Sequence, residues 1–408
     1  MKRAGRIVTA ITAICLLTGG CRQTGEEQQR KAQETREELV LWTYYETEQQ
    51  KEALQELTEG FNASQDQYLL RWEYHGPLTE FNKKMAIGIT QKQLPDIVIL
   101  DNPDMRRYVE QGVLEDLTME IAKIENLDNY YPNVMDSVRY NDRYYGIPFC
   151  SNNVALIYNE DVFLEKGLSV PENWEEFLEC AAVLTEGERK GFAMSENEGE
   201  QSAFQILPFI LSAGDEINQL GGQGTREAFA LVRQLVDMGY MSKECINWSQ
   251  NDVARKFVDG ECAMMENGPW VLPALEEAGV PYKIAELPYK FQPAGVMGGE
   301  NLGVMKGKNA DGAVAFMKYY NQEEQMLKTN IRANALPPRK DVAQKMLEVC
   351  PEYEIFAKQM ETCIGRTSCE NWLQVTELLS KAQFEIITGR ITPEEAVDLI
   401  REQGGEFS

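Results

Sequence analysis

Histidine is almost missing from the chain, because its 408 residues include only one, His75. Any Ser-His-Asp or Cys-His catalytic site would have to use this residue, and metal sites built from several histidines are excluded. His75 lies in the run Trp-Glu-Tyr-His-Gly-Pro, where a predicted strand enters a turn, with no nucleophile motif nearby. We therefore expect no catalytic role for it.

Cysteines are few and irregularly spaced. The chain has nine, none in a C-x-x-C pair, and seven remain when Cys15 and Cys21 near the N-terminus are set aside. This odd set is neither a disulfide framework nor a zinc site, so we predict no metal, and no motif indicates a cofactor. Cys363 and Cys369 are close enough in sequence to pair in an oxidising medium. Four others lie in apolar surroundings typical of buried thiols: Cys150, Cys180, Cys245 and Cys262.

Positive charge and long apolar runs are also scarce. The chain has 40 Lys and Arg against 65 Asp and Glu, a net charge of −25. Such acidity argues against nucleic acid or anionic lipid head groups as ligands. No segment after residue 21 approaches 18 consecutive apolar residues, so we expect a soluble body. Roughly 370 residues exceed what one hydrophobic core usually organises, which suggests two domains.

The N-terminal segment has the composition of an export signal. Three cations at positions 2, 3 and 6 precede an apolar run over 7–17 that is too short to span a bilayer, and Thr-Gly-Gly then leads to Cys21. This ending resembles a bacterial lipoprotein signal, in which cleavage leaves an acylated N-terminal cysteine, although Leu17 is displaced by one position. Ordinary secretion and an uncleaved anchor are the alternatives. All three place the body outside the cytoplasmic membrane, and the polar residues 22–37 are expected to be a solvated tether.

The next segment alternates between strand and helix patterns. Apolar runs at 39–42, 68–74 and 95–100 predict strands, and helical spacing over 50–62 and 81–90 predicts the connections between them. This order is typical of a parallel α/β sheet with right-handed crossovers. Further on, strands are expected at 144–149, 154–159 and 263–265, Asn173 is expected to cap a helix over 174–185, and the residues after about 341 are mostly helical in pattern.

Several short motifs follow one another along the chain. They are Leu-Pro-Asp-Ile-Val-Ile-Leu-Asp at 94–101, Tyr-Gly-Ile-Pro at 145–148, Leu-Ile-Tyr-Asn-Glu-Asp-Val-Phe at 156–163, Pro-Glu-Asn-Trp-Glu-Glu-Phe at 171–177, Asn-Gly-Pro-Trp at 267–270, Gly-Gly-Glu-Asn-Leu-Gly-Val at 298–304 and Thr-Gly-Arg-Ile-Thr-Pro-Glu-Glu-Ala at 388–396. In their order and spacing they resemble the bacterial extracellular solute-binding proteins of ABC importers, in the sugar-binding group that includes maltose-binding protein. The resemblance covers about 39–396.

That resemblance implies a two-lobed α/β fold with the ligand held in a cleft between the lobes. Lobe 1 is expected from 38–150 plus 299–337, and lobe 2 from 154–295 plus 340–400. The chain would cross between lobes near 150–154, 295–299 and 336–340. A monomer that docks on the permease subunits of an ABC importer is expected, with a lipid anchor as its contact with the membrane.

Candidate ligand-binding residues follow the predicted strands, because ligands of open α/β sheets bind beyond the carboxyl ends of the strands. Sugars present C–H faces to aromatic rings and hydroxyls to carboxylates and amides, and the strand ends supply both types. The candidates are Tyr44, Tyr45 and Glu46 after the first strand, Asp101 and Asn102 after the third, and Trp270 after the strand at 263–265.

Other candidates come from the expected crossings and from position in the family. Asn152 is favoured in the first crossing over its neighbour, and Gly298 and Gly299 permit unusual backbone angles in the second, with Glu300 a possible hydroxyl acceptor. Arg332 is a weaker candidate, with solvated surface as the alternative. Trp372 is either a stacking aromatic or part of a helical core.

The expected function is therefore lobe closure on a sugar, expected to be an oligosaccharide, and delivery to an importer without catalysis. Within binding proteins, the alternatives are a polyamine, a peptide or glycerol phosphate, the last of which requires a basic or helix-N-terminal site. A surface glycosidase with two carboxylates and a sensor subunit for a membrane kinase are alternatives from other classes.

Overall fold

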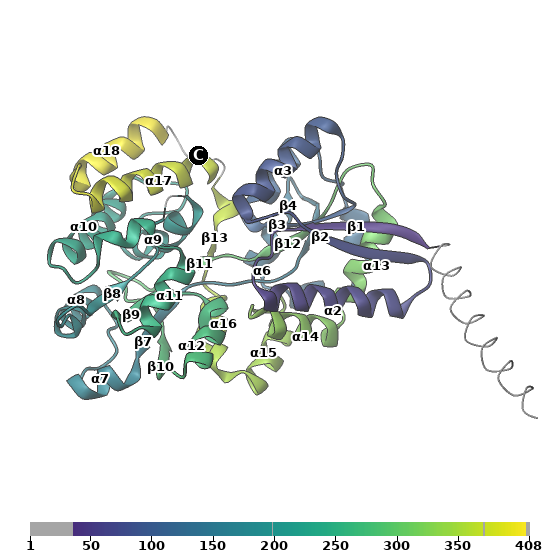
Figure 1. Cartoon of the computed structure of the whole chain (residues 1–408). Coiled ribbons are helices and arrows are strands. Elements are labelled where there is room, and N and C mark those ends of the chain that lie inside the picture. Colours follow the sequence, from purple (N-terminus) through teal and green to yellow (C-terminus); the bar gives the residue numbers. More distant parts are fainter. Residues whose placement is uncertain (1–35, 198, 370–371, 405–408) are drawn as a thin grey trace, which may run out of the picture.

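The computed structural model describes residues 36–197, 199–369 and 372–404. The leader, Cys21 and most of the expected tether lie outside these ranges. The described residues form two β-sheets with helices around them, and these lie side by side in Figure 1 with β11 (Val296–Met297) and β13 (Ile364–Gly365) between them. Within the described residues, no helix is both long enough and apolar enough to cross a membrane.

The first sheet is built mainly from the N-terminal part of the chain. Its five strands are, in sheet order, β2 (Tyr68–Tyr74), β1 (Glu37–Thr43), β3 (Ile97–Asp101), β12 (Glu300–Val304) and β6 (Gly146–Pro148). The first three pair in parallel, as predicted, and β3 is buried along its whole length, as is usual for parallel strands. β12 returns from much later in the chain and runs antiparallel to β3 and β6, so the sheet is mixed rather than wholly parallel.

Two helices of the first sheet, α2 and α13, begin at side-chain caps. α2 (Glu48–Ser64) starts with a capping box between Thr47 and Gln50, and buries one face through Leu54, Leu57 and Phe61. The remaining elements of this part are α3 (Leu78–Gln91), α4 (Asn102–Glu110), α5 (Thr118–Ile121), η1 (Leu127–Asn129), α6 (Pro132–Asp136), β4 (Arg139–Tyr140), β5 (Arg143–Tyr144), α13 (Ala310–Tyr320) and α14 (Glu323–Ala333). The short loop 44–47 connects β1 to α2, and this loop therefore lies at the end of the first sheet.

The second sheet has four strands in the order β10 (Tyr282–Ala285), β7 (Ala155–Asn159), β9 (Cys262–Asn267) and β8 (Lys190–Ala193). β8 is parallel to β9, whereas β7 and β10 are antiparallel to their neighbours. Helices cover both faces: α7 (Glu160–Lys166), α8 (Trp174–Leu184), α9 (Glu200–Ser212), α10 (Gln223–Asp237), η2 (Lys243–Asn247), α11 (Gln250–Val258), η3 (Pro269–Val271), α12 (Leu272–Ala278), α15 (Lys340–Val349), η4 (Pro351–Tyr353), α16 (Glu354–Gln359), η5 (Arg366–Ser368), α17 (Trp372–Ile387) and α18 (Pro393–Gly404). Asn173 caps α8, as predicted, by accepting from the backbone of Glu176.

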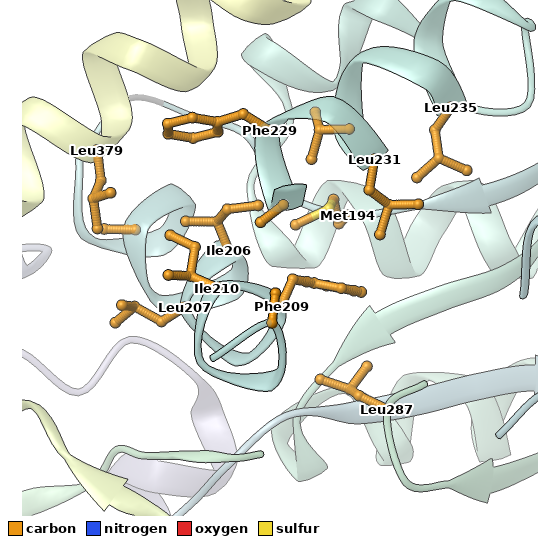
Figure 2. Close-up of a cluster of buried hydrophobic side chains, with 14 of the residues drawn as sticks. Met194, Ile206, Leu207, Phe209, Ile210, Phe229, Leu231, Leu235, Leu287 and Leu379 are labelled. Carbon is orange, nitrogen blue, oxygen red and sulfur yellow. The ribbon is translucent and has the colours of Figure 1, made fainter. Parts of the chain in front are cut away.

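The largest hydrophobic core packs α9, α10 and α17 together (Figure 2). Ile206 and Ile210 of α9 lie near Phe229 of α10 and Leu379 of α17, and all four side chains are fully buried. Burial of apolar area at about 25 cal/mol per Å² stabilises this arrangement. The C-terminal helices therefore belong to the core of the second sheet. Their packing against α9 positions the start of α9 relative to the strands.

Three extended segments run side by side between the two sheets. Asn152 pairs with Gly298 through two backbone hydrogen bonds, and Ser151 pairs in the same way with Leu336. A fourth segment joins them, because β11 pairs in parallel with β13. The sequence did not indicate this last segment, which brings residue 366 next to the others. Cys363, just before β13, is a buried thiol and forms no disulfide with Cys369.

Candidate functional site

A cavity of about 400 Å³ is lined by residues from around both sheets. This volume lies in the range of about 300–1,000 Å³ that is usual for small-molecule sites. Eight of the twelve predicted binding residues line it: Tyr44, Tyr45, Glu46, Asp101, Asn152, Trp270, Gly299 and Glu300. Five of these eight were predicted from strand ends, and Asn152, Gly299 and Glu300 from the expected crossings.

The loop after β1 contributes aromatic and acidic groups. The ring of Tyr45 is buried against Phe149, whereas Tyr44 is partly exposed and Glu46 is exposed at the cavity. The Tyr44 hydroxyl donates to the Glu300 carboxylate over 3.1 Å. Two residues that are 256 positions apart in sequence thus form one polar group of the cavity wall.

Glu300 begins β12 and accepts two hydrogen bonds from neutral donors. One comes from Tyr44, and the Cys150 thiol donates to the other carboxylate oxygen. Burial raises the pKa of Glu300 to about 7, the hydrogen bond from Cys150 opposes that rise, and the charge of Asp101 adds to it. Burial and the charge of Glu300 raise the pKa of the Cys150 thiol, which keeps its proton available for donation.

A second polar group of the cavity joins elements from the two sheets through Arg366. Its guanidinium donates to both oxygens of Asp101, at 2.8 and 3.3 Å, and forms an ion pair with Glu200 at the start of α9. Burial lowers the pKa of Arg366, but the two carboxylates raise it by more, so its net pKa lies above the usual range. Burial raises the pKa of Glu200, and Arg366 opposes that rise. Arg366 thus links the end of β3 to α9.

Trp270 lies on η3, directly after β9. It is partly exposed, lines the cavity and packs at the edge of the second sheet's cores. A Cβ atom on Gly268 would lie 2.1 Å from the indole, so the close approach of the ring to the backbone requires glycine at that position. The indole is therefore held against the chain and still reaches the cavity.

Gly299 also occupies a place that only glycine fits. Its φ is +124°, and a Cβ atom there would lie 2.3 Å from the Cys150 carbonyl oxygen. This close contact brings the crossing segments together at the cavity, where Asn152 also lines the wall. The predicted need for unusual backbone angles is confirmed at Gly299.

The structure places four predicted binding residues outside the cavity lining. Asn102 is fully buried and donates to Ser137 at 2.9 Å. Gly298 bonds through its backbone to Asn152, and Arg332 is exposed and forms an ion pair with Glu52. Trp372 is buried, and its indole N–H donates to Glu200 at 2.9 Å, so it contacts a lining residue from behind.

Sequence reasoning missed Arg366 and Glu200, and with them Phe204, Gln250 and Asn251 in the lining. Arg366 follows a two-residue strand, and its guanidinium lies 4.8 Å from the centre of the Phe204 ring. No local motif marks these residues, although Arg366 follows a glycine and Glu200 begins a helix. Among the described residues, no three His, Cys, Asp or Glu side chains are placed to hold a metal ion.

The chain is similar in sequence to known solute-binding proteins. A sequence profile of the family described as bacterial extracellular solute-binding protein matches residues 56–355. The multiple sugar-binding protein of Streptococcus mutans is 23% identical over 329 residues, 76% of each chain. The sn-glycerol-3-phosphate-binding periplasmic protein UgpB of Rhizobium meliloti is 24% identical over 328 residues, 73% of this chain and 74% of that one.

The fold is also shared with solved structures. A solute-binding protein of an ABC transporter from Thermotoga lettingae, bound with α-D-tagatose, superposes with a TM-score of 0.82 at 20% identity. The match covers 91% of this chain and 99% of that one. This likeness shows a two-lobed fold, and the sequence profile covers most of the chain. The chain belongs to the bacterial extracellular solute-binding proteins.

Proposed function

We propose that the chain binds a sugar, of oligosaccharide size, in the cavity and delivers it to an ABC importer without altering it. The observation that carries this proposal is the composition of the cavity lining. The aromatic side chains of Tyr44 and Trp270 share it with the carboxylates of Asp101 and Glu300 and the amide of Asn152. Aromatic faces suit the C–H faces of a sugar ring, and carboxylates and amides suit its hydroxyls.

The proposed mechanism is closure of two lobes on the ligand. Lobe 1 would comprise 38–150 plus 299–337, and lobe 2 would comprise 154–295 plus 340–400, with the crossing segments as the hinge. A ligand that contacts both lobes favours the closed form by its differential affinity for that form. The closed form would then dock, as a monomer, on the permease subunits of the importer.

Membership of the family places the folded body on the outer side of the cytoplasmic membrane. Our proposal adds a lipid on Cys21 as the anchor, with residues 22–37 as the tether. Expression of the full chain and of the variant Cys21→Ser tests it. The unmodified chain should fractionate with membranes and carry the mass of an acyl group, and the variant should do neither.

Glycerol phosphate is a second candidate ligand, because a relative that binds it covers a similar share of the chain. Among the described residues, however, Arg366 is the one cationic group in the lining, and it is already paired with Asp101 and Glu200. A phosphate needs free cations or backbone donors. The starts of α9 and α11 lie in the lining and could supply backbone donors, but without a free cation in the described lining the cavity favours a sugar over glycerol phosphate.

A ligand panel tests the function. Thermal unfolding and calorimetry are measured with mono- and oligosaccharides, sn-glycerol 3-phosphate, spermidine and a short peptide. A bound sugar at 100 times its dissociation constant should stabilise the protein by about 2.7 kcal/mol. Chromatography of the recovered sugar should show no change, since a glycosidase would release product. Binding of glycerol phosphate, spermidine or peptide in place of every sugar would overturn the proposal, and so would turnover of the sugar.

A further inference from the structure

Charged side chains in the cavity lining are unevenly divided between the two signs. Among the described residues, the lining contains four carboxylic acids, Glu46, Asp101, Glu200 and Glu300, and one cation, Arg366. Even with Arg366 fully paired, acidic groups remain in excess. A solute that enters this cavity therefore meets an electrostatic environment that disfavours anions.

The nitrogen atoms of Arg366 are all used by protein groups. Nη1 and Nη2 donate to Asp101 and Glu200, and Nε donates to the carbonyl oxygen of Met297 at 3.3 Å. The side chain is 4% exposed. An anionic solute would have to displace a buried carboxylate to reach this cation, which would leave that carboxylate without its partner.

Glu300 differs from the two carboxylates of this pair because its partners in the described structure are neutral. Tyr44 and Cys150 donate one hydrogen bond to each of its oxygens, and neither brings a positive charge. Glu300 as a residue is partly exposed and lines the cavity. Closure over a neutral solute would bury this group with no cation bonded to it, which favours its protonated form, whereas a cation on the solute would stabilise the charged carboxylate.

We propose that the bound sugar carries an ammonium group and that the Glu300 carboxylate is the acceptor for that group. This inference rests on the proposed function, because it names the class of sugar that the same cavity takes. The ammonium donates to Glu300 beside the Tyr44 ring, and such a ring attracts a cation placed over its face. The hydroxyl groups of the sugar are left for the carboxylates and amides elsewhere in the lining.

Matched pairs of sugars test the inference. Calorimetric dissociation constants are measured at pH 7 for glucosamine, galactosamine and mannosamine against glucose, galactose and mannose, and for chitobiose against cellobiose and N,N′-diacetylchitobiose. At least one amino sugar should bind about ten-fold or more tightly than its hydroxyl and acetylated counterparts, because a charge-assisted hydrogen bond is stronger than a neutral one. If neutral sugars bind as well as or better than every amino sugar, the inference is overturned and the proposed function stands. If no sugar of either kind binds, the proposed function itself fails.

Two variants assign the effect to Glu300. The substitution Glu300→Gln keeps the size of the side chain and removes its charge, so the advantage of the amino sugar should fall to less than about two-fold. Glu277→Gln is the matched control, because Glu277 is exposed, lies on α12 and does not line the cavity. It should keep the full advantage. An advantage that persists in Glu300→Gln, with circular dichroism showing a folded variant, would also overturn the inference.

Discussion

Two carboxylate groups in the wall of one cavity are held in different ways. Asp101 is paired with the cation of Arg366, which also pairs with Glu200 across the cavity. Glu300 instead accepts hydrogen bonds from a phenol and a thiol. A third arrangement occurs in the interior around β9, where both oxygens of Glu266 and one oxygen of Glu196 have no partner among the described residues. The partner of each carboxyl group, and not burial alone, therefore determines how much that group contributes to stability.

The largest effect is expected from the ion-paired group. Arg366→Met should destabilise the protein by about 3–5 kcal/mol, because it leaves the buried Asp101 and the partly exposed Glu200 without a cation. Urea unfolding followed by circular dichroism measures this change. The triple variant Arg366→Met with Asp101→Asn and Glu200→Gln should recover most of the loss, since it removes the uncompensated charges as well. An equal loss in both variants would show that Arg366 acts through packing against Phe204.

Glu196, a buried carboxyl group with one unpartnered oxygen, should respond to pH. Burial raises the pKa of Glu196 to about 8, which a hydrogen bond from Ser202 opposes. Because the folded-state pKa lies above the unfolded value, the protonated form of Glu196 contributes to the free energy of unfolding. This contribution is fully present below about pH 4.3, the unfolded pKa, and is lost as the pH rises through about 8. Glu196→Gln should therefore be more stable than the unmodified protein at pH 9, by about 1–3 kcal/mol, and show little gain at pH 5.

Unfolding free energies at the two pH values measure this difference. Glu348→Gln is the control, because Glu348 is exposed on α15 and the substitution changes the net charge by the same amount. It should show no gain specific to pH 9. Equal behaviour of the two variants would contradict the assignment of the pH effect to the buried group.

Local patterns predicted the elements that hold these carboxylates better than they predicted the partners. The strand at 68–74 has the predicted limits, and Asn173 caps its helix, because alternation and capping depend on neighbouring residues. Asp101 was identified because it follows a predicted strand, and Glu300 because it follows the two glycines of the second expected crossing. Arg366 and Glu200 lie 166 positions apart, and α17 packing against α9 determines their approach. No sequence window contains that information, and the same reason explains the missed antiparallel entry of β12 into the first sheet.

Where a residue had two plausible roles, only the tertiary structure distinguished between them. Trp270 follows a proline and Trp372 follows an asparagine, but the first lines the cavity and the second is buried behind Glu200. Asn102 directly follows Asp101, yet it begins α4 and turns into the interior to reach Ser137. Neighbouring residues at a strand end can therefore face in different directions.

Loss of a hydrogen bond to Glu300 should have an effect of similar size, and this effect should depend on the ionisation of Glu300. Tyr44→Phe removes one donor, so it should destabilise the protein by about 1.5–3 kcal/mol at pH 8.5, where the carboxylate is charged, and by about 0.5–1.5 kcal/mol at pH 5.5. Because the pKa of Glu300 is about 7, the change between these values should fall near that pH. Tyr130→Phe is the control, since the Tyr130 hydroxyl donates to the neutral Asn321 side chain at 3.0 Å. Its cost should be the same at both pH values, and a pH-independent cost for Tyr44→Phe would mean that Glu300 does not titrate in this range.

The smallest effect is expected where a cation and a carboxylate are paired in solvent. Arg332 of α14 pairs with Glu52 of α2, and both side chains are about half exposed, at 47% and 51%. Water and salt screen such a pair, so Arg332→Ala should reduce the free energy of unfolding by less than about 1 kcal/mol. It should leave ligand affinity unchanged, because Arg332 does not line the cavity. Arg332 and Arg366 both pair with carboxylates, so the ratio of their effects measures how much burial changes the value of an ion pair. A loss of ligand affinity in Arg332→Ala would instead show that Arg332 reaches the cavity in the ligand-bound form.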